Sequence, residues 1–241
     1  MTGASNRPGP TGGPEPHGQG SQLGDFILGW QDGLVNVLGI VLGLAAANQP
    51  IRILLLGGLA ATFAEAVSMG AVTYTSMMAR HDNYLAERAR EQREMAEVPE
   101  TERAEVRTVF EEWGYSRPDS EALATQIASN PKAWLEFMMA HELKLQPVEE
   151  TAVRRSALLV FFATLVGSLI PLAPVLLLNN SRWGSVGAVV VSSFALFGIG
   201  WYGARLTVGS PRRSGLQLAV IGILAGLAGF AVGLLLGGGP I

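Results

Sequence analysis

The chain has 241 residues, of which 49% are hydrophobic, 30 are glycine and only 15% are charged. This composition is too apolar and too rich in glycine for an ordinary soluble domain, and the absence of cysteine excludes disulfides, thiolate metal sites and cysteine nucleophiles. The formal net charge of −3 hides a segregation, because residues 80–150 hold 16 of the 20 acidic residues and only 9 of the 17 basic ones.

Apolar segments long enough to cross a bilayer alternate with short polar turns along most of the chain. Residues 1–22 contain almost no apolar side chains and predict a disordered tail. Residues 25–47 and 51–78 each supply the roughly 20 mostly apolar residues that a bilayer core requires. Three further spans are predicted after the acidic segment, at 157–178, 186–206 and 216–236.

The predicted fold is therefore all-α, an integral membrane protein with five transmembrane helices and one inserted cytoplasmic helical domain. Its parts are a tail (1–22), the first two spans (23–79), an acidic helical domain (80–150) and the last three spans (151–241). Within the insert, strong helix formers predict helices near 80–97, 100–113, 118–128 and 131–143. Pro99 ends the first of these helices, Gly114 suits a C-cap, and Asn130 followed by Pro131 suits an N-terminus.

Basic residues predict the orientation, because loops on the cytoplasmic side are enriched in lysine and arginine. One side carries Arg80, Arg154, Arg155, Arg205, Arg212 and Arg213, whereas the other carries only Arg52 and Arg182. The tail and the acidic domain are accordingly expected in the cytoplasm and the C-terminus on the far side. Short spans and a Gly/Pro tail favour a bacterial inner (plasma) membrane, although a vacuolar membrane would present the same topology.

Two polar residues interrupt the first span. An ionisable group within a bilayer costs about 2.5–3.5 kcal/mol on insertion scales, so Asp32 is a functional candidate. Asn36 lies one helical turn further, on the same face. The alternative is that Asp32 lies near the membrane surface and is simply hydrated.

The second span carries a polar stripe, because Glu65, Met69, Thr73 and Ser76 recur at helical spacing. Carboxylate and hydroxyl oxygens with a thioether sulfur on one face are typical of a path for divalent cations. Packing between helices would explain the hydroxyl groups equally well, but it explains Glu65 poorly.

Glutamates in the insert recur three residues apart, which puts each pair on one helix face. The candidate metal ligands of the insert are Glu91, Glu94, Glu102, Glu105, Met138, Met139 and Glu142. Clustered carboxylates repel one another unless a cation lies among them, so the pattern indicates divalent metal binding. Ordinary solvated helix faces, neutralised by nearby arginines, remain the alternative.

Several other functions lack any signal in the sequence. There is no phosphate-binding glycine loop, histidine-rich cluster or catalytic triad, so neither an enzyme nor a nucleic-acid partner is expected. No prosthetic group is expected either. A transporter, a membrane-anchored metal sensor or storage scaffold, and a structural bundle that docks a basic partner remain open at this point.

Four motifs, in this order, resemble the vacuolar iron transporter family. They are Asp32-Gly33-Leu34-Val35, Ser68-Met69 followed by Tyr74, Leu169-Ile170-Pro171-Leu172-Ala173-Pro174, and Ala204-Arg205-Leu206-Thr207 with Ser210-Pro211. The resemblance implies a five-span homodimer that moves Fe²⁺, and often Mn²⁺, out of the cytosol in exchange for protons. It also implies that Asp32 and Met69 line the pore and that the glutamates and methionines named above bind metal in the cytoplasmic domain.

The second span departs from the family pattern. The usual Gly-Glu-Tyr or Gly-Glu-Phe is replaced by Val72-Thr73-Tyr74, and an earlier family glutamate falls on Ala61. This chain instead has Glu65, one turn before Met69. We therefore expect a pore of Asp32, Asn36, Glu65, Met69 and Thr73, with Fe²⁺ or Mn²⁺ as substrate and bound ion.

Overall fold

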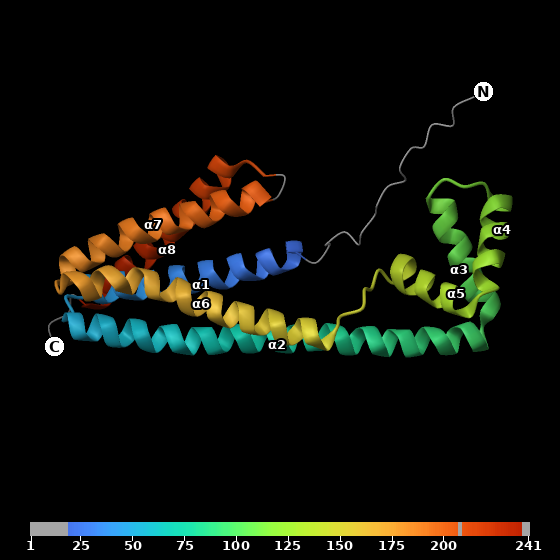
Figure 1. Ribbon diagram of the computed structural model, residues 1–241, viewed down its shortest axis with the longest axis horizontal. Helices are drawn as coiled ribbons and strands as arrows, with labels where there is room; N and C mark the ends of the chain where they lie inside the picture. Colours follow the sequence, from blue (N-terminus) through green and yellow to red (C-terminus); the bar gives the residue numbers. More distant parts are fainter. Residues whose placement is uncertain (1–18, 207–208, 238–241) are drawn as a thin grey trace, which may run out of the picture. The chain divides into compact units, whose positions relative to one another are not determined.

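The computed structural model describes residues 19–206 and 209–237, and every regular element in this part of the chain is a helix (Figure 1). The helices are α1 (Gln19–Ala46), α2 (Ile51–Glu97), α3 (Pro99–Glu112), α4 (Arg117–Ala128), α5 (Pro131–Phe137), the π-helical turn η1 (Met138–Glu142), α6 (Glu150–Leu178), α7 (Ser181–Leu206) and α8 (Pro211–Gly237). The chain divides into two compact units. Unit 1 joins the residues up to Met69 with those from Leu159 onward, and unit 2 is Gly70–Leu158.

Five helices are long and apolar enough to cross a membrane: α1, α2, α6, α7 and α8. Their most apolar windows have mean hydropathies between 1.5 and 2.5, with no more than two charged residues in each. The predicted all-α fold and the five predicted spans are therefore confirmed, and the chain is a multi-pass membrane protein.

Several helices begin earlier than the apolar pattern predicts. α6 begins at Glu150, α7 at Ser181 and α8 at Pro211, each five to seven residues before the predicted span. α1 begins at Gln19, within the stretch predicted to be a disordered tail, while residues 1–18 of that stretch lie outside the described residues. A helix, once nucleated, gains a hydrogen bond for each residue it adds, so polar residues beside an apolar span join it.

α2 is a single helix of 47 residues, where the sequence predicts a span at 51–78 and a separate helix at 80–97. At 1.5 Å per residue its length is about 70 Å, more than twice the roughly 30 Å of a bilayer core. Only its first half can therefore lie in the membrane. The sequence RHDNYLAERAREQREMAE continues the helix because it contains strong helix formers and no glycine or proline.

Glycines allow the helices of unit 1 to pack closely. α1 packs against α7 and α8, and α7 packs against α8 (Figure 1). A Cβ added at Gly215 of α8 would lie 2.8 Å from the carbonyl oxygen of Phe197 on α7, and one added at Gly43 of α1 would lie 2.9 Å from the carbonyl oxygen of Gly229. Such short distances mean that side chains larger than hydrogen do not fit, so the packing fixes the rotation of α1 about its axis.

Unit 2 has its own apolar core, made of Val106, Phe110, Ala124, Trp134 and Met138. The predicted caps of its helices are confirmed. The Asn130 side chain accepts hydrogen bonds from the backbone N–H groups of Lys132 and Ala133, at 3.1 and 3.3 Å, and Gly114 has a φ of +92° just after α3.

The last helix predicted in the insert, 131–143, is interrupted by a change of helix type. α5 ends at Phe137, and the N–H of Leu143 donates to the carbonyl oxygen of Met138, five residues earlier, at 3.0 Å. This bond makes the η1 turn one residue wider than an α-helical turn. Such π turns are rare and occur frequently at functional sites.

Candidate functional site

A cavity of about 590 Å³ lies between α1 and α2 in unit 1. Its lining includes both polar residues of the first span and part of the predicted polar stripe of the second span. The lining residues are Asp32, Asn36, Ile40, Ala61, Ala64, Glu65, Ser68 and Met69. Thr73, the fifth residue predicted for the pore, is not among them.

The polar side chains of this cavity interact with one another. The Asn36 side-chain amide donates a hydrogen bond to the Glu65 carboxylate, and Asp32 lies close enough to Glu65 to interact with it electrostatically. Asp32 and Glu65 are half-buried, whereas Asn36 is exposed. An amide that donates to one carboxylate oxygen leaves the remaining lone pairs available for a cation.

The chemistry of the cavity suits a divalent transition-metal ion. Carboxylate and amide oxygens bind hard divalent ions, and the Met69 sulfur adds affinity for softer ones such as Fe²⁺. Ala61 also lines the cavity, and Glu65 on the next turn is the carboxylate that α2 contributes here.

A second group of acidic residues lies in unit 2, where α2, α3 and η1 meet. Glu91 on α2 and Glu102 on α3 are only 3% and 4% exposed. One oxygen of each carboxylate, Glu91 Oε1 and Glu102 Oε2, is buried without a hydrogen-bond partner. The Oε2 atom of Glu142 is likewise buried without a hydrogen-bond partner. Buried carboxylate oxygens without partners are costly, and a bound cation would relieve that cost.

Burial and mutual repulsion change the protonation of this group. Burial raises the pKa of Glu91 to about 8, and a hydrogen bond with Glu102 and the negative charges of Glu102, Glu142 and Glu94 add to the increase. Burial also raises the pKa values of Glu105 and Glu142, to which the negative charge of Glu102 contributes. The five candidate glutamates therefore influence one another across three helices, and we call them the acidic cluster.

The acidic cluster is not a preformed metal site. In residues 19–206 and 209–237, no three His, Asp or Glu side chains converge closely enough to hold one ion. Met139 is 3% exposed, whereas Met138 is fully buried and belongs to the apolar core of unit 2. Ion binding would therefore require side-chain rotation by the glutamates, and Met138 is the candidate ligand whose burial is already explained by packing.

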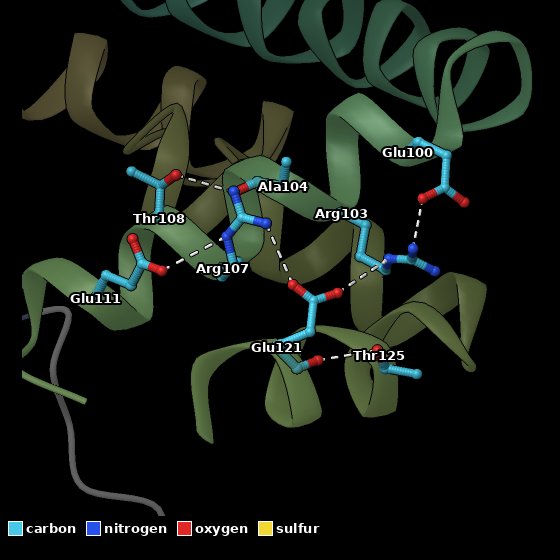
Figure 2. A network of polar contacts seen from close by, with 8 residues as sticks. All are labelled: Glu100, Arg103, Ala104, Arg107, Thr108, Glu111, Glu121 and Thr125. Atoms are coloured by element: carbon cyan, nitrogen blue, oxygen red, sulfur yellow. Dashed lines mark hydrogen bonds and ion pairs between the residues drawn. The ribbon is translucent and has the colours of Figure 1, made fainter. Parts of the chain in front are cut away.

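Two other carboxylates of α3, Glu100 and Glu111, have arginine partners (Figure 2). Arg103 contacts Glu100 and lies 3.9 Å from Glu121 of α4, and Arg107 lies 3.2 Å from Glu121 and 3.6 Å from Glu111. Glu102 and Glu105 have no such partner in the part of the chain that the structure describes. The arginines of α3 therefore neutralise the face that joins α4 and leave the acidic cluster unneutralised.

Two residues near the acidic cluster were not predicted as part of any site. Glu87 adds to the negative charge that raises the pKa of Glu142, and Arg90 lowers the pKa values of Glu105 and Glu142 that burial raises. The spacing of Glu87, Glu91 and Glu94, at intervals of four and three residues, could have revealed one acidic face on the helix.

Comparison with known proteins gives a consistent result. A family described as the VIT family matches residues 23–234. Vacuolar iron transporter 1 of Arabidopsis thaliana is 35% identical over 213 residues, which cover 88% of this chain and 85% of that protein. Vacuolar iron transporter 2 of Oryza sativa subsp. japonica is 37% identical over 88% of this chain and 87% of its own length. A vacuolar iron transporter of Toxoplasma gondii is 31% identical over 87% of this chain and 72% of that protein.

Proposed function

Because this chain belongs to the VIT family, we propose that it transports a divalent metal ion, Fe²⁺ or Mn²⁺, across a membrane. The relatives named iron transporters support this proposal, since their similarity covers most of both chains. The observation that carries it is the cavity between α1 and α2, where Asp32, Glu65 and Met69 offer oxygen and sulfur ligands within spanning helices. Iron is preferred to calcium or magnesium because a thioether adds little for hard ions.

The proposed mechanism is an exchange of the metal ion for protons. The acidic cluster collects the ion from the cytosol and increases the amount available to the cavity. Asp32 and Met69 then coordinate it, assisted by Asn36 and Glu65, and protonation of Asp32 or Glu65 from the far side releases it. Each proton that binds a carboxylate removes the charge that holds the ion, so metal and proton compete for the same oxygen atoms.

We further propose that the transporter is a homodimer. Asn36 is exposed in the single chain, and Asp32 and Glu65 are only half-buried, although all three belong to spanning helices. Polar side chains in a bilayer face protein or water rather than lipid. A second copy that covers this face would enclose the cavity and complete a pore between the first spans of the two protomers.

The proposed orientation puts the N-terminus and the acidic cluster in the cytoplasm, because arginines are concentrated at the ends of the spans on that side. The relatives, which are named vacuolar transporters, do not support the bacterial inner membrane that the sequence led us to expect. We therefore propose that the metal ion moves out of the cytosol, and the proposal does not depend on which membrane holds the protein.

One observation favours a second function, a metal sensor or storage scaffold that does not transport. The glutamates that the family pattern would have at positions 61 and 73 are alanine and threonine, and Thr73 does not line the cavity. A chain that had lost pore carboxylates could still bind metal through the acidic cluster. The two functions differ in whether metal crosses the bilayer.

The deciding experiment is uptake of Fe²⁺ and Mn²⁺ into proteoliposomes under an imposed proton gradient. We compare the wild-type protein with Asp32→Ala and with a matched control, Asp25→Ala, which removes a carboxylate of α1 that does not line the cavity. Gradient-dependent uptake that is lost only in Asp32→Ala supports the exchanger. Absence of uptake by the wild-type protein, with metal still bound, supports the storage or sensor function.

A further inference from the structure

Arg90 is the basic residue that contacts the acidic cluster directly. It lies on α2, and its Nε is 3.1 Å from Glu94 Oε1, while its Nη1 is 3.5 Å from Glu87 Oε2. Among the described residues, no other basic side chain forms an ion pair with any of the five glutamates of the cluster. Arg90 is thus the one cation that the described residues supply there.

The charge of Arg90 acts on three helical elements. It pairs with Glu94 on α2, and its electric field also favours the ionised forms of Glu105 on α3 and Glu142 in η1. Glu91 and Glu102, more than nine-tenths buried, still have oxygen atoms without partners. One guanidinium therefore offsets only part of the negative charge, and the cluster retains the capacity to take a divalent cation.

The ion pairs of Arg90 differ from those that hold unit 2 together. Arg103 and Arg107 connect α3 to α4 through Glu121 (Figure 2). Both partners of Arg90 lie on its own helix, three residues before and four residues after it, so its pairs join no two elements. The Arg90 side chain is also 59% exposed and can leave its partners without disturbing the core. Its position therefore indicates a role in the charge of the cluster and not in packing.

We infer that Arg90 is an internal counter-ion that competes with the divalent metal for Glu94, so that metal capture displaces the guanidinium. This inference rests on the proposed function of the acidic cluster as a collector of metal. A fixed positive charge beside the ligands repels an incoming cation and occupies one of the oxygen atoms that would bind it. Arg90 thus weakens metal binding and makes the captured ion easier to release, which suits delivery and opposes storage.

The test measures Mn²⁺ affinity in the full-length protein in detergent, from the electron paramagnetic resonance signal of free Mn²⁺. All proteins carry Asp32→Ala, so that the cavity of unit 1 contributes little. Arg90→Gln is compared with Arg93→Gln, which removes the same charge from the same helix at an exposed residue without an ion pair in the described chain. Arg90→Lys, which keeps the charge, serves as the conservative variant.

We expect Arg90→Gln to bind Mn²⁺ roughly three- to tenfold more tightly and to release it more slowly. Arg93→Gln should change the affinity by less than about twofold, as expected for an exposed charge screened by salt. Arg90→Lys should restore most of the wild-type affinity, and the melting temperatures should stay alike. Equal affinities in Arg90→Gln and Arg93→Gln, or weaker binding in Arg90→Gln, would overturn the inference.

A fourth variant separates this inference from the proposed function. Glu102→Gln removes a buried ligand and should abolish most Mn²⁺ binding if the acidic cluster is the collector. If binding persists in Glu102→Gln, the collecting role fails and the inference about Arg90 fails with it. If binding is lost in Glu102→Gln while Arg90→Gln behaves like Arg93→Gln, the collector stands and only the counter-ion inference fails.

Discussion

The cavity of unit 1 and the acidic cluster of unit 2 use the same carboxylate chemistry in different surroundings. In the cavity, two carboxylates, Asp32 and Glu65, share an open space with an amide and a thioether. In the cluster, five glutamates on three elements lie close together, and two of them are almost completely buried. The difference teaches that the few accessible ligands of the cavity are suited to passing one ion at a time. The crowded carboxylates of the acidic cluster are suited to collecting ions from a dilute solution.

The largest expected effect tests whether the cavity alone carries transport. Asp32→Ala should reduce the maximal rate of Mn²⁺ uptake into proteoliposomes by roughly 100-fold or more, since even changes outside the ligand shell cost about 10- to 100-fold. The affinity of the acidic cluster, measured on the same variant, should stay unchanged because Asp32 belongs to unit 1. Uptake close to that of the wild-type protein would exclude Asp32 from the path.

A smaller effect is expected when the collector is weakened and the cavity is left intact. Glu102→Gln should raise the metal concentration needed for half-maximal uptake by roughly tenfold while leaving the maximal rate nearly unchanged. The physical reason is that capture limits uptake only when metal is scarce. A matched change, Glu112→Gln, removes an exposed glutamate of α3 without an ion pair among the described residues and should have no effect. A fall in the maximal rate of Glu102→Gln would contradict the division of roles.

The pKa of Glu91 predicts a pH dependence of stability in the metal-free protein. Its folded-state pKa of about 8 lies above the value of 4.5 for a free side chain, so the folded state binds the proton more tightly. The contribution of Glu91 to stability should therefore be fully present below about pH 4.5 and should be lost as the pH rises toward and through about 8. We expect the apparent melting temperature to fall by roughly a few degrees between pH 6 and pH 9.

Two controls accompany this measurement. The Glu91→Gln side chain cannot ionise, so this variant should lose most of the fall in melting temperature between pH 6 and pH 9. Added Mn²⁺ should reduce the same fall in the wild-type protein, because the metal neutralises the cluster. A melting temperature that rises between pH 6 and pH 9 would show that the buried carboxylate does not control stability.

The smallest effect concerns the carboxylates that have arginine partners. Glu121→Gln removes the shared partner of Arg103 and Arg107 and should lower stability by about 0.5–1 kcal/mol, as is usual for partly exposed ion pairs. At pH 8 the change in stability should be opposite in sign to that caused by Glu91→Gln, because Glu91→Gln removes a buried charge. Thermal denaturation of both variants measures the contrast, and a stabilised Glu121→Gln protein would contradict it.

The sequence predicted most of the fold because its signals are local. Spans follow from apolar length, and the ends of α3 and α5 follow from Gly114 and Asn130, whose backbone roles depend on few neighbours. The sequence did not predict that α2 continues through residues 78–80. No proline or glycine marks that point, so a change from apolar to charged composition was mistaken for a boundary.

The candidate site was predictable in part for the same reason. Asp32, Asn36, Glu65 and Met69 lie together because their spacing puts each pair on one helix face. Thr73 shares that spacing but does not line the cavity, since the stripe extends along α2 beyond it. The contact of Arg90 with Glu94 and the burial of Glu91 depend on how α3 and η1 pack, which spacing within one helix does not reveal.

The η1 turn has a consequence for how this chain tolerates change. Because the turn holds one residue more than an α-helical turn, Glu142 at its end is rotated by about 100° relative to its place in a regular helix. Deletion of one residue within η1, such as Ala140, would restore an ordinary helix and swing Glu142 out of alignment with the other carboxylates. Substitution of the same alanine would keep the alignment. The length of this segment, more than its composition, is thus the property that lineages of this protein should preserve.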